Sequence, residues 1–130
     1  MATLKIRPED HLVGKQIEPG IYSVEIKEYT ESLASDKAKH PGSQNFNFTA
    51  KIIGGNYDGI PIKWQFNETA PGFAIDFFNA LGHKIDPKSE VNITSDMFKK
   101  CVGCKLRVVM KNTLVGNKMY NNVDGYLPAQ

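Results

Sequence analysis

The change in hydrophobic period along the chain constrains the fold more than any other feature of the sequence. Apolar and polar residues alternate in five stretches, and one segment with helical spacing interrupts them after the third stretch. The alternating stretches are residues 21–29, 45–53, 60–66, 104–111 and 119–127. Alternation indicates strands with one wet face, whereas spacing of three to four residues indicates an amphipathic helix. The order therefore predicts a mainly β domain.

The helical segment has recognisable ends. Apolar residues recur at helical spacing over 73–81, and Gly82 is suited to the backbone conformation that ends many helices. A second short helix is predicted to begin after Thr94 or Ser95 and to end at Gly103. We therefore expect one or two helices between the third and fourth strands.

The segments between these elements complete the expected topology. Residues 30–44 are small and polar, which predicts a mobile loop, and residues 112–118 predict a hairpin. A five-stranded Greek-key barrel with a helix between its third and fourth strands is the OB-fold, which binds oligonucleotides or oligosaccharides. The sequence therefore predicts one OB-fold-like domain over residues 20–128, preceded by an N-terminal arm over residues 1–19.

Composition sets the class of protein. The chain has 130 residues, of which 41% are hydrophobic and 23% are charged, and this predicts one globular domain with its own core. No apolar run approaches the roughly 20 residues that a membrane helix needs. The first ten residues contain no hydrophobic signal core. We therefore expect a cytoplasmic protein with no membrane partner.

The charge of the chain is unevenly distributed. The net charge is only +2, but residues 1–94 carry 10 Lys and Arg against 12 Asp and Glu, whereas residues 95–130 carry 6 against 2. A basic C-terminal third on a near-neutral body can form one positive stripe that attracts phosphates. The alternative of an ordinary solvated lysine surface stays open from the asymmetry alone.

The polar positions of the expected strands carry cations and tyrosines. Single-stranded nucleic acid requires cations that contact phosphates and exposed rings on which bases stack, with about 1–3 kcal/mol for each stacked base. The mixture predicts a nucleic-acid-binding face, although Lys and Tyr are also common on the strands of any soluble barrel. The predicted contact residues are Lys27, Tyr29, Lys51, Lys63, Lys105, Arg107, Lys111, Tyr120 and Tyr126.

The single tryptophan has two interpretations. Trp64 is a candidate stacking platform, but it shares its alternation phase with Ile62 and Phe66. Apolar neighbours on the same side of a strand favour packing in the core. We therefore predict that Trp64 is buried.

One cysteine pair matches a metal or redox pattern. Cys101 and Cys104 fit C-x-x-C, but a structural zinc needs four ligands and the sequence has no second cysteine pair. A thioredoxin-type pair belongs at the N-terminus of a helix, whereas this pair lies at the end of the predicted one, with Cys101 on its apolar face. Two reduced structural thiols are predicted, with no metal and no cofactor.

Signals for an enzyme are weak. The three histidines are scattered, and no nucleophile elbow, zinc-protease helix or phosphate-binding loop is present. The best enzyme candidate is a nuclease in which Glu9, Asp10 and Glu25 hold Mg²⁺ and Lys27 stabilises the developing charge. Because Glu-x-Lys on a strand is common by chance, we expect a non-catalytic protein.

Several short motifs occur along the chain in an order typical of one group of proteins. They are Gly20-Ile21-Tyr22, the turn before Ile60, Phe77-Phe78-Asn79-Ala80-Leu81-Gly82, Phe98 with Val102-Gly103-Cys104-Lys105-Leu106-Arg107-Val108, and Lys118-Met119-Tyr120-Asn121-Asn122-Val123-Asp124-Gly125-Tyr126-Leu127-Pro128. In these motifs the chain resembles a family of small phage and prophage proteins, catalogued as of unknown function and encoded near recombination and replication genes. The resemblance covers most of residues 20–128.

The resemblance implies an OB-fold protein that binds single-stranded DNA in phage replication or recombination, in the cytoplasm of a bacterial host cell. The implied partners are single-stranded DNA and phage recombination or replication proteins. The chain ends at Gln130 without an acidic tail, so recruitment of host proteins through such a tail is not expected. A protein-interaction module in a recombination complex stays an alternative, and the sequence does not decide between a monomer and a homodimer or between DNA and RNA.

Overall fold

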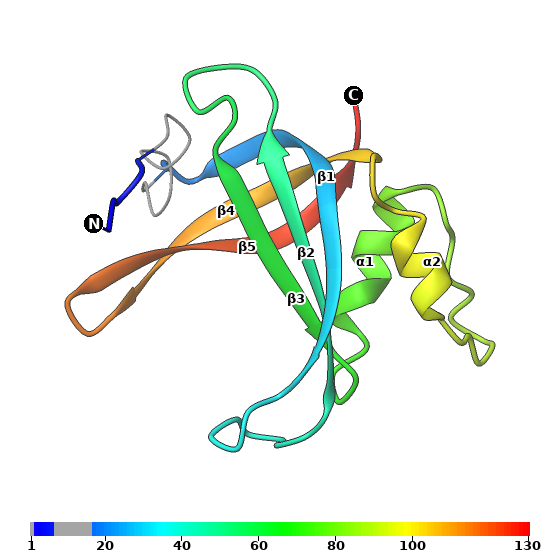
Figure 1. Ribbon diagram of the computed structural model, residues 1–130. Coiled ribbons are helices and arrows are strands. Elements are labelled where there is room, and N and C mark those ends of the chain that lie inside the picture. The colour runs from blue at the N-terminus through cyan, green and yellow to red at the C-terminus, as the bar shows by residue number, and fades with distance from the viewer. Residues whose placement is uncertain (1, 7–16) are drawn as a thin grey trace.

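The structure consists of five strands and two helices in the predicted order (Figure 1). It is a computed structural model that describes residues 2–6 and 17–130, so most of the predicted arm lies outside the described residues. The elements are β1 (Gly20–Leu33), β2 (Gln44–Ile52), β3 (Pro61–Asn67), α1 (Phe73–Ala80), α2 (Ser95–Lys99), β4 (Lys105–Val115) and β5 (Lys118–Pro128). Within the described ranges, neither helix is long and apolar enough to cross a membrane. The mainly β prediction is confirmed.

The strands form one antiparallel sheet in the order β3-β2-β1-β4-β5. In the described strands no backbone ladder joins the edges β3 and β5, so the predicted closure into a barrel is not found. The two edges meet through side chains, because the ring centroids of Trp64 and Tyr126 lie 5.7 Å apart. Phe77 of α1 contacts both rings at 5.9 and 5.3 Å. Rings therefore fill the seam between β3 and β5 in place of a ladder.

Two connections are shorter than predicted because the strands run further. β1 continues to Leu33, which pairs with Gln44, so the first loop is 34–43 instead of 30–44. β4 and β5 pair as far as Val115 and Lys118, which leaves Gly116-Asn117 as a two-residue turn. Gly116 has a φ of 62°, a conformation that such hairpin turns require and that glycine adopts without strain. The hairpin at 111–122 consequently projects from the body of the sheet (Figure 1).

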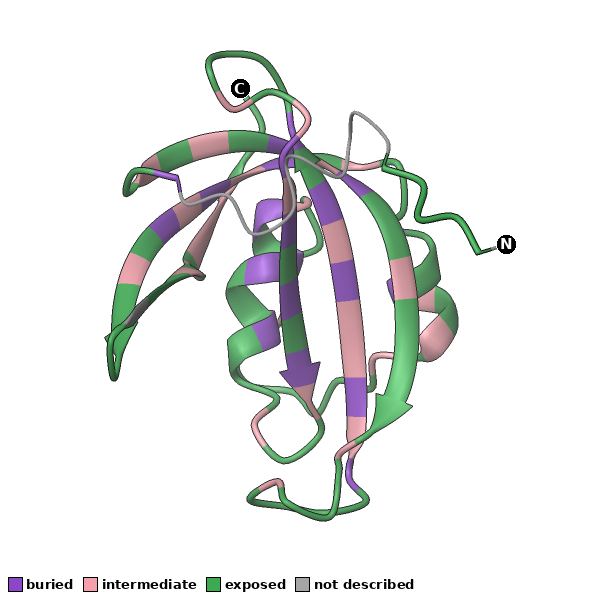
Figure 2. Ribbon diagram, turned by 60° about the vertical axis from the view of Figure 1, so that its left-hand side comes forward, coloured by how far each residue is buried: buried purple, intermediate pink, exposed green. Residues whose placement is uncertain are grey.

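An aromatic cluster holds the helices against one face of the sheet. Phe48 of β2 is 1% exposed and lies 5.0 Å from Phe77 of α1. Phe98 of α2 stacks on Phe46 at 4.6 Å. Trp64 is 8% exposed, which confirms its predicted burial. Figure 2 shows buried and exposed positions alternating along the strands, and we call the face opposite the helices the outer face.

Two β-bulges change which side chains lie on this outer face. The register between β1 and β2 shifts between Ile26 and Glu28, which leaves Lys27 as an extra residue. The register between β4 and β5 also shifts, and Asp124 is the extra residue there. Because successive side chains of a strand point to opposite faces, one extra residue moves every following side chain to the other face.

The prediction that Tyr29 and Tyr126 face outward is therefore wrong. Tyr29 stacks on Phe98 at 5.5 Å with an interplanar angle of 8°, and Tyr126 lies 5.3 Å from Phe77. Burial raises the pKa of both tyrosine hydroxyls. Tyr120 is the one predicted stacking ring that stays on the outer face, where 48% of the residue is exposed.

Substituting Tyr126→Ala is expected to lower the free energy of unfolding by about 3 kcal/mol, because it removes a ring from the aromatic cluster and leaves a cavity. Tyr120→Ala, on the other face of the same strand, is the matched control and is expected to change stability by less than about 0.5 kcal/mol. Urea unfolding followed by circular dichroism measures both. Equal losses in the two variants would contradict the inward position of Tyr126.

Candidate nucleic-acid interface

The predicted cations share the outer face. Glu25 pairs with Lys51 on β2 and with Lys105 on β4, so these three side chains form one cross-strand row. Residues two apart on a strand share a face, and the register places the other cations beside this row. The six are Lys27, Lys51, Lys63, Lys105, Arg107 and Lys111. Their contact with nucleic acid stays a prediction.

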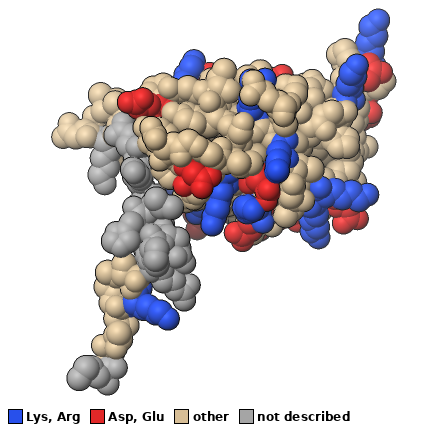
Figure 3. Space-filling view, turned by 90° about the horizontal axis from the view of Figure 1, so that it is seen from above, with Lys and Arg blue, Asp and Glu red and all other residues tan. Residues whose placement is uncertain are grey.

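Carboxylates interrupt this positive face. Lys27 forms an ion pair with Glu25, and its hydrogen bond holds the pKa of Glu25 below the ordinary value. At the other end, Lys111 Nζ lies 3.0 Å from Asp124 Oδ2. Figure 3 shows basic and acidic side chains next to each other, not one uninterrupted basic field. A polyanion that binds here competes with these internal ion pairs.

A shallow groove follows the outer face across β1, β2 and β3. It consists of two neighbouring hollows of about 450 and 290 Å³, which we call the outer groove. Its lining includes Thr49, Lys63 and Gln65 in the first hollow and Lys27, Lys51 and Lys105 in the second. Three carboxylates also line it, Glu28 in the first hollow and Glu25 and Asp58 in the second. Cations, hydroxyls and amides are the groups that most often contact phosphate and sugar. The outer groove therefore has the chemistry of a backbone-binding surface.

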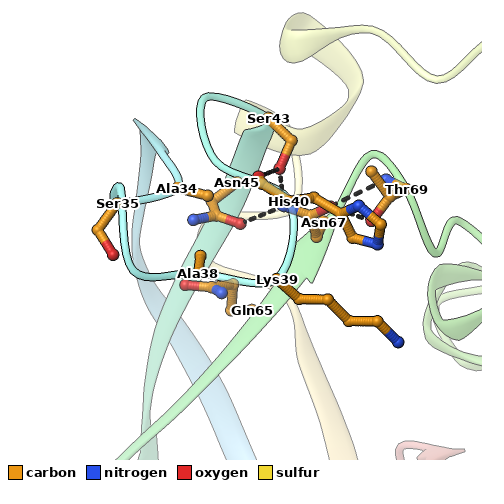
Figure 4. A pocket seen from close by; sticks show the side chains of 10 residues that line it. All are labelled: Ala34, Ser35, Ala38, Lys39, His40, Ser43, Asn45, Gln65, Asn67 and Thr69. Carbon is orange, nitrogen blue, oxygen red and sulfur yellow. Dashed lines mark hydrogen bonds between the residues drawn. The ribbon is translucent and has the colours of Figure 1, made fainter.

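A third hollow lies where the loop 34–43 folds over the ends of β2 and β3 (Figure 4). This loop pocket has a volume of about 390 Å³ and shares Gln65 with the outer groove. Sequence analysis did not identify its two asparagines, Asn45 and Asn67, which pair across β2 and β3. The sequence did contain a signal for Asn45, because it alternates with the apolar residues of its strand and follows the polar loop directly. Only the pairing of the strands brings Asn67 next to it.

The projecting hairpin carries exposed apolar side chains. Leu114, Val115 and Met119 are exposed, and they lie next to Tyr120. Tyr120 pairs with Thr113, which shares the outer face with Lys111. The one outward ring therefore stands on the hairpin, away from the cross-strand row of cations.

No support for a metal-dependent reaction comes from the described ranges, 2–6 and 17–130. Within them, no group of three or more His, Cys, Asp or Glu residues could hold a metal ion. Glu9 and Asp10, the carboxylates of the nuclease hypothesis, lie outside the described residues. Glu25 and Lys27, the other two members, form an ion pair with each other.

The two cysteines have different environments at the end of α2. Cys101 is buried and Cys104 is partly exposed, and both thiols are free. Burial raises the pKa of the Cys101 thiol to about 11. Its Sγ donates to the Met97 carbonyl oxygen at 3.4 Å. Because the thiolate is the reactive form, Cys101 has the environment of an inert structural residue.

Alkylation with iodoacetamide at pH 8 is expected to label Cys104 at least tenfold faster than Cys101 in the folded protein. The reason is that a thiol with a pKa of about 11 is almost fully protonated at this pH and is shielded by the core. Mass spectrometry of digested samples measures both rates. In denaturant the two rates are expected to converge, and equal rates in the folded protein would contradict the burial of Cys101.

No protein-family model matches this chain, and no curated protein matches it.

Proposed function

We propose that this protein binds single-stranded DNA on its outer face, without catalysis and largely without sequence preference, in phage replication or recombination. The single observation that carries the proposal is the gathering of six cations on one face of the sheet, four of which line the outer groove. Lysine and arginine that follow a groove neutralise phosphates regardless of base sequence. The shallow groove favours an unpaired strand over a compact small ligand.

We further propose that the fold is an OB-fold whose seam is completed by side chains. The strand order, the helices between β3 and β4, and the contact between Trp64 and Tyr126 support this assignment. OB-folds bind oligonucleotides on the face of strands 2 and 3 and on the loops before strands 2 and 5. The outer groove, the loop pocket and the hairpin occupy these three places.

A gel-shift experiment with dT and duplex oligomers at two salt concentrations tests the function directly. The expected result is a shift of the dT oligomer that weakens as salt rises, with little shift of the duplex. Labelled DNA that stays intact with Mg²⁺, as it does with EDTA, is expected for a protein without nuclease activity. Absence of any shift at low salt would refute single-strand binding.

Lys63→Glu is expected to weaken binding of a dT oligomer about tenfold at low salt and to reduce the salt slope by roughly one. Lys63 is exposed on the edge strand β3, where it lines the outer groove. Arg107 Nε instead donates to the Pro128 carbonyl oxygen, so reversing the charge of Arg107 would also disturb β4 and β5. Lys88→Glu is the matched control, because Lys88 is exposed on the connector between the helices. Fluorescence titration measures each variant, and equal losses would contradict the outer groove as the binding surface.

Glu25→Gln is expected to change affinity in the opposite direction. Removing this carboxylate releases Lys27 and leaves the cross-strand row with two lysines and no acidic side chain. Because an exposed ion pair is weak, the gain in affinity is expected to be modest, about two- to fivefold at low salt. The same titration at high salt is the control, since screening removes the gain. A loss of affinity at low salt would show that Glu25 itself supports binding.

A protein-interaction module in a recombination complex is the second candidate function. The exposed Leu114, Val115 and Met119 on the projecting hairpin favour it, because contiguous exposed apolar side chains mark interaction surfaces. In that case oligonucleotide affinity is negligible, and purified phage recombination proteins bind the wild type but not a Leu114→Asp variant.

A further inference from the structure

The loop pocket is closed by the loop's own backbone. Ala34 N donates to the Ser43 carbonyl oxygen at 2.8 Å, and Gly42 N donates to the Ala34 carbonyl oxygen at 3.0 Å. These bonds hold the loop 34–43 as a rim over the outer ends of β2 and β3. Figure 4 shows Ala34, Ser35 and Ala38 on the loop, with the Asn45 and Gln65 side chains of β2 and β3 next to Ala38.

Hydrogen bonds inside the pocket fix the orientation of Asn45. Asn67 Nδ2 donates to Ser43 Oγ at 2.9 Å and to Asn45 Oδ1 at 2.7 Å. Thr69 donates to Asn67 Oδ1 from its backbone nitrogen at 2.9 Å, so the Asn67 amide cannot be reversed without losing this contact. Asn45 therefore accepts through Oδ1 and turns its Nδ2 away from Asn67.

The Asn45 Nδ2 donor has no hydrogen-bond partner within residues 2–6 and 17–130, although Asn45 is only 8% exposed. Among the described residues, the fully buried side-chain atoms without a partner are Trp64 Nε1 and Asn112 Oδ1, so Asn45 Nδ2 still reaches solvent in the pocket, where the acceptor of a ligand can replace water. In Figure 4 Ala38 lies between the Asn45 amide, drawn above it, and the Gln65 amide, drawn below it. The pocket thus combines a neutral donor, a second amide and the methyl groups of Ala34 and Ala38.

We infer that the loop pocket holds one unpaired nucleobase, whose ring carbonyl accepts a hydrogen bond from Asn45 Nδ2; this inference rests on the proposed single-strand binding. Amides of Asn and Gln read the edges of bases, and those edges are free only in an unpaired strand. A phosphate would need cations, but Lys39 lies on the exposed rim and the inner groups are neutral. Gln65 lines both the pocket and the outer groove, so a strand in the groove leads into the pocket.

The test compares thymine, which has two ring carbonyls, with adenine, which has none. Asn45→Asp keeps the acceptor for Asn67 and replaces the free donor by an acceptor, which suits the adenine amino group. The ratio of affinities for dT and dA oligomers is expected to fall roughly three- to tenfold in this variant, as for one lost hydrogen bond. Asn47→Asp is the matched control, because it adds the same charge two residues away on the same face and is expected to weaken both oligomers alike.

The outcomes separate the two proposals. If the wild type binds neither oligomer, single-strand binding is refuted and the base pocket with it. If the wild type binds but Asn45→Asp leaves the dT to dA ratio unchanged, the base pocket alone is refuted. Should circular dichroism show that Asn45→Asp does not fold, Ala38→Phe replaces it, because this ring on the loop fills the pocket and leaves Asn45 in place. Ala38→Phe must then lower the same ratio, and an unchanged ratio refutes the pocket.

Discussion

The packing of Phe77 between the two edges of the sheet is the constraint on which the rest of the structure depends. This fully buried ring from α1 contacts Phe48 and Phe66 on one side and Tyr126 on the other. It therefore holds the inner faces of β2, β3 and β5 around one centre without a ladder between the edges. Because both helices pack on this inner face, the outer face remains open to solvent. Its polar side chains are therefore accessible to a ligand.

Alternation in the sequence predicted the strands well, but it did not predict where alternation breaks. Strand number, element order and the burial of Trp64 follow from apolar periodicity, because each buried position needs an apolar side chain. The bulge at Lys27 has no local signal, since lysine fits any exposed strand position. At Asp124 the following Gly125 was a usable signal, because an isolated glycine within a strand often marks a bulge. Each missed bulge put one tyrosine on the wrong face in the prediction, Tyr29 after Lys27 and Tyr126 after Asp124. The reason is that a shift of one residue exchanges the two faces of a strand.

One part of the candidate site could be predicted from the pattern within single strands, and the other part depends on how the strands pair. The cations on the outer face were predictable because each precedes any bulge on its own strand or, at Lys27, occupies the bulge itself. The loop pocket was not predictable, because it exists only when β2 and β3 pair and bring Asn45 beside Asn67. The orientation of the Asn45 amide, with Oδ1 toward Asn67 and Nδ2 away from it, depends on a contact with a residue 22 positions away. No pattern within a single strand contains that information.

Because Tyr29 and Tyr126 point inward, base stacking contributes less to the proposed binding than the sequence predicted, and phosphate contacts contribute more. Three stacked bases would contribute roughly 3–9 kcal/mol, and one outward ring supplies about a third of that. Phosphate contacts then carry most of the affinity, and they weaken as salt rises. The carboxylates of Glu25 and Asp124 weaken them further, because a bound strand competes for Lys27 and Lys111. A hydrogen bond from the neutral Asn45 amide is insensitive to this screening, so a base in the loop pocket would keep the strand in register when the phosphate contacts are weak.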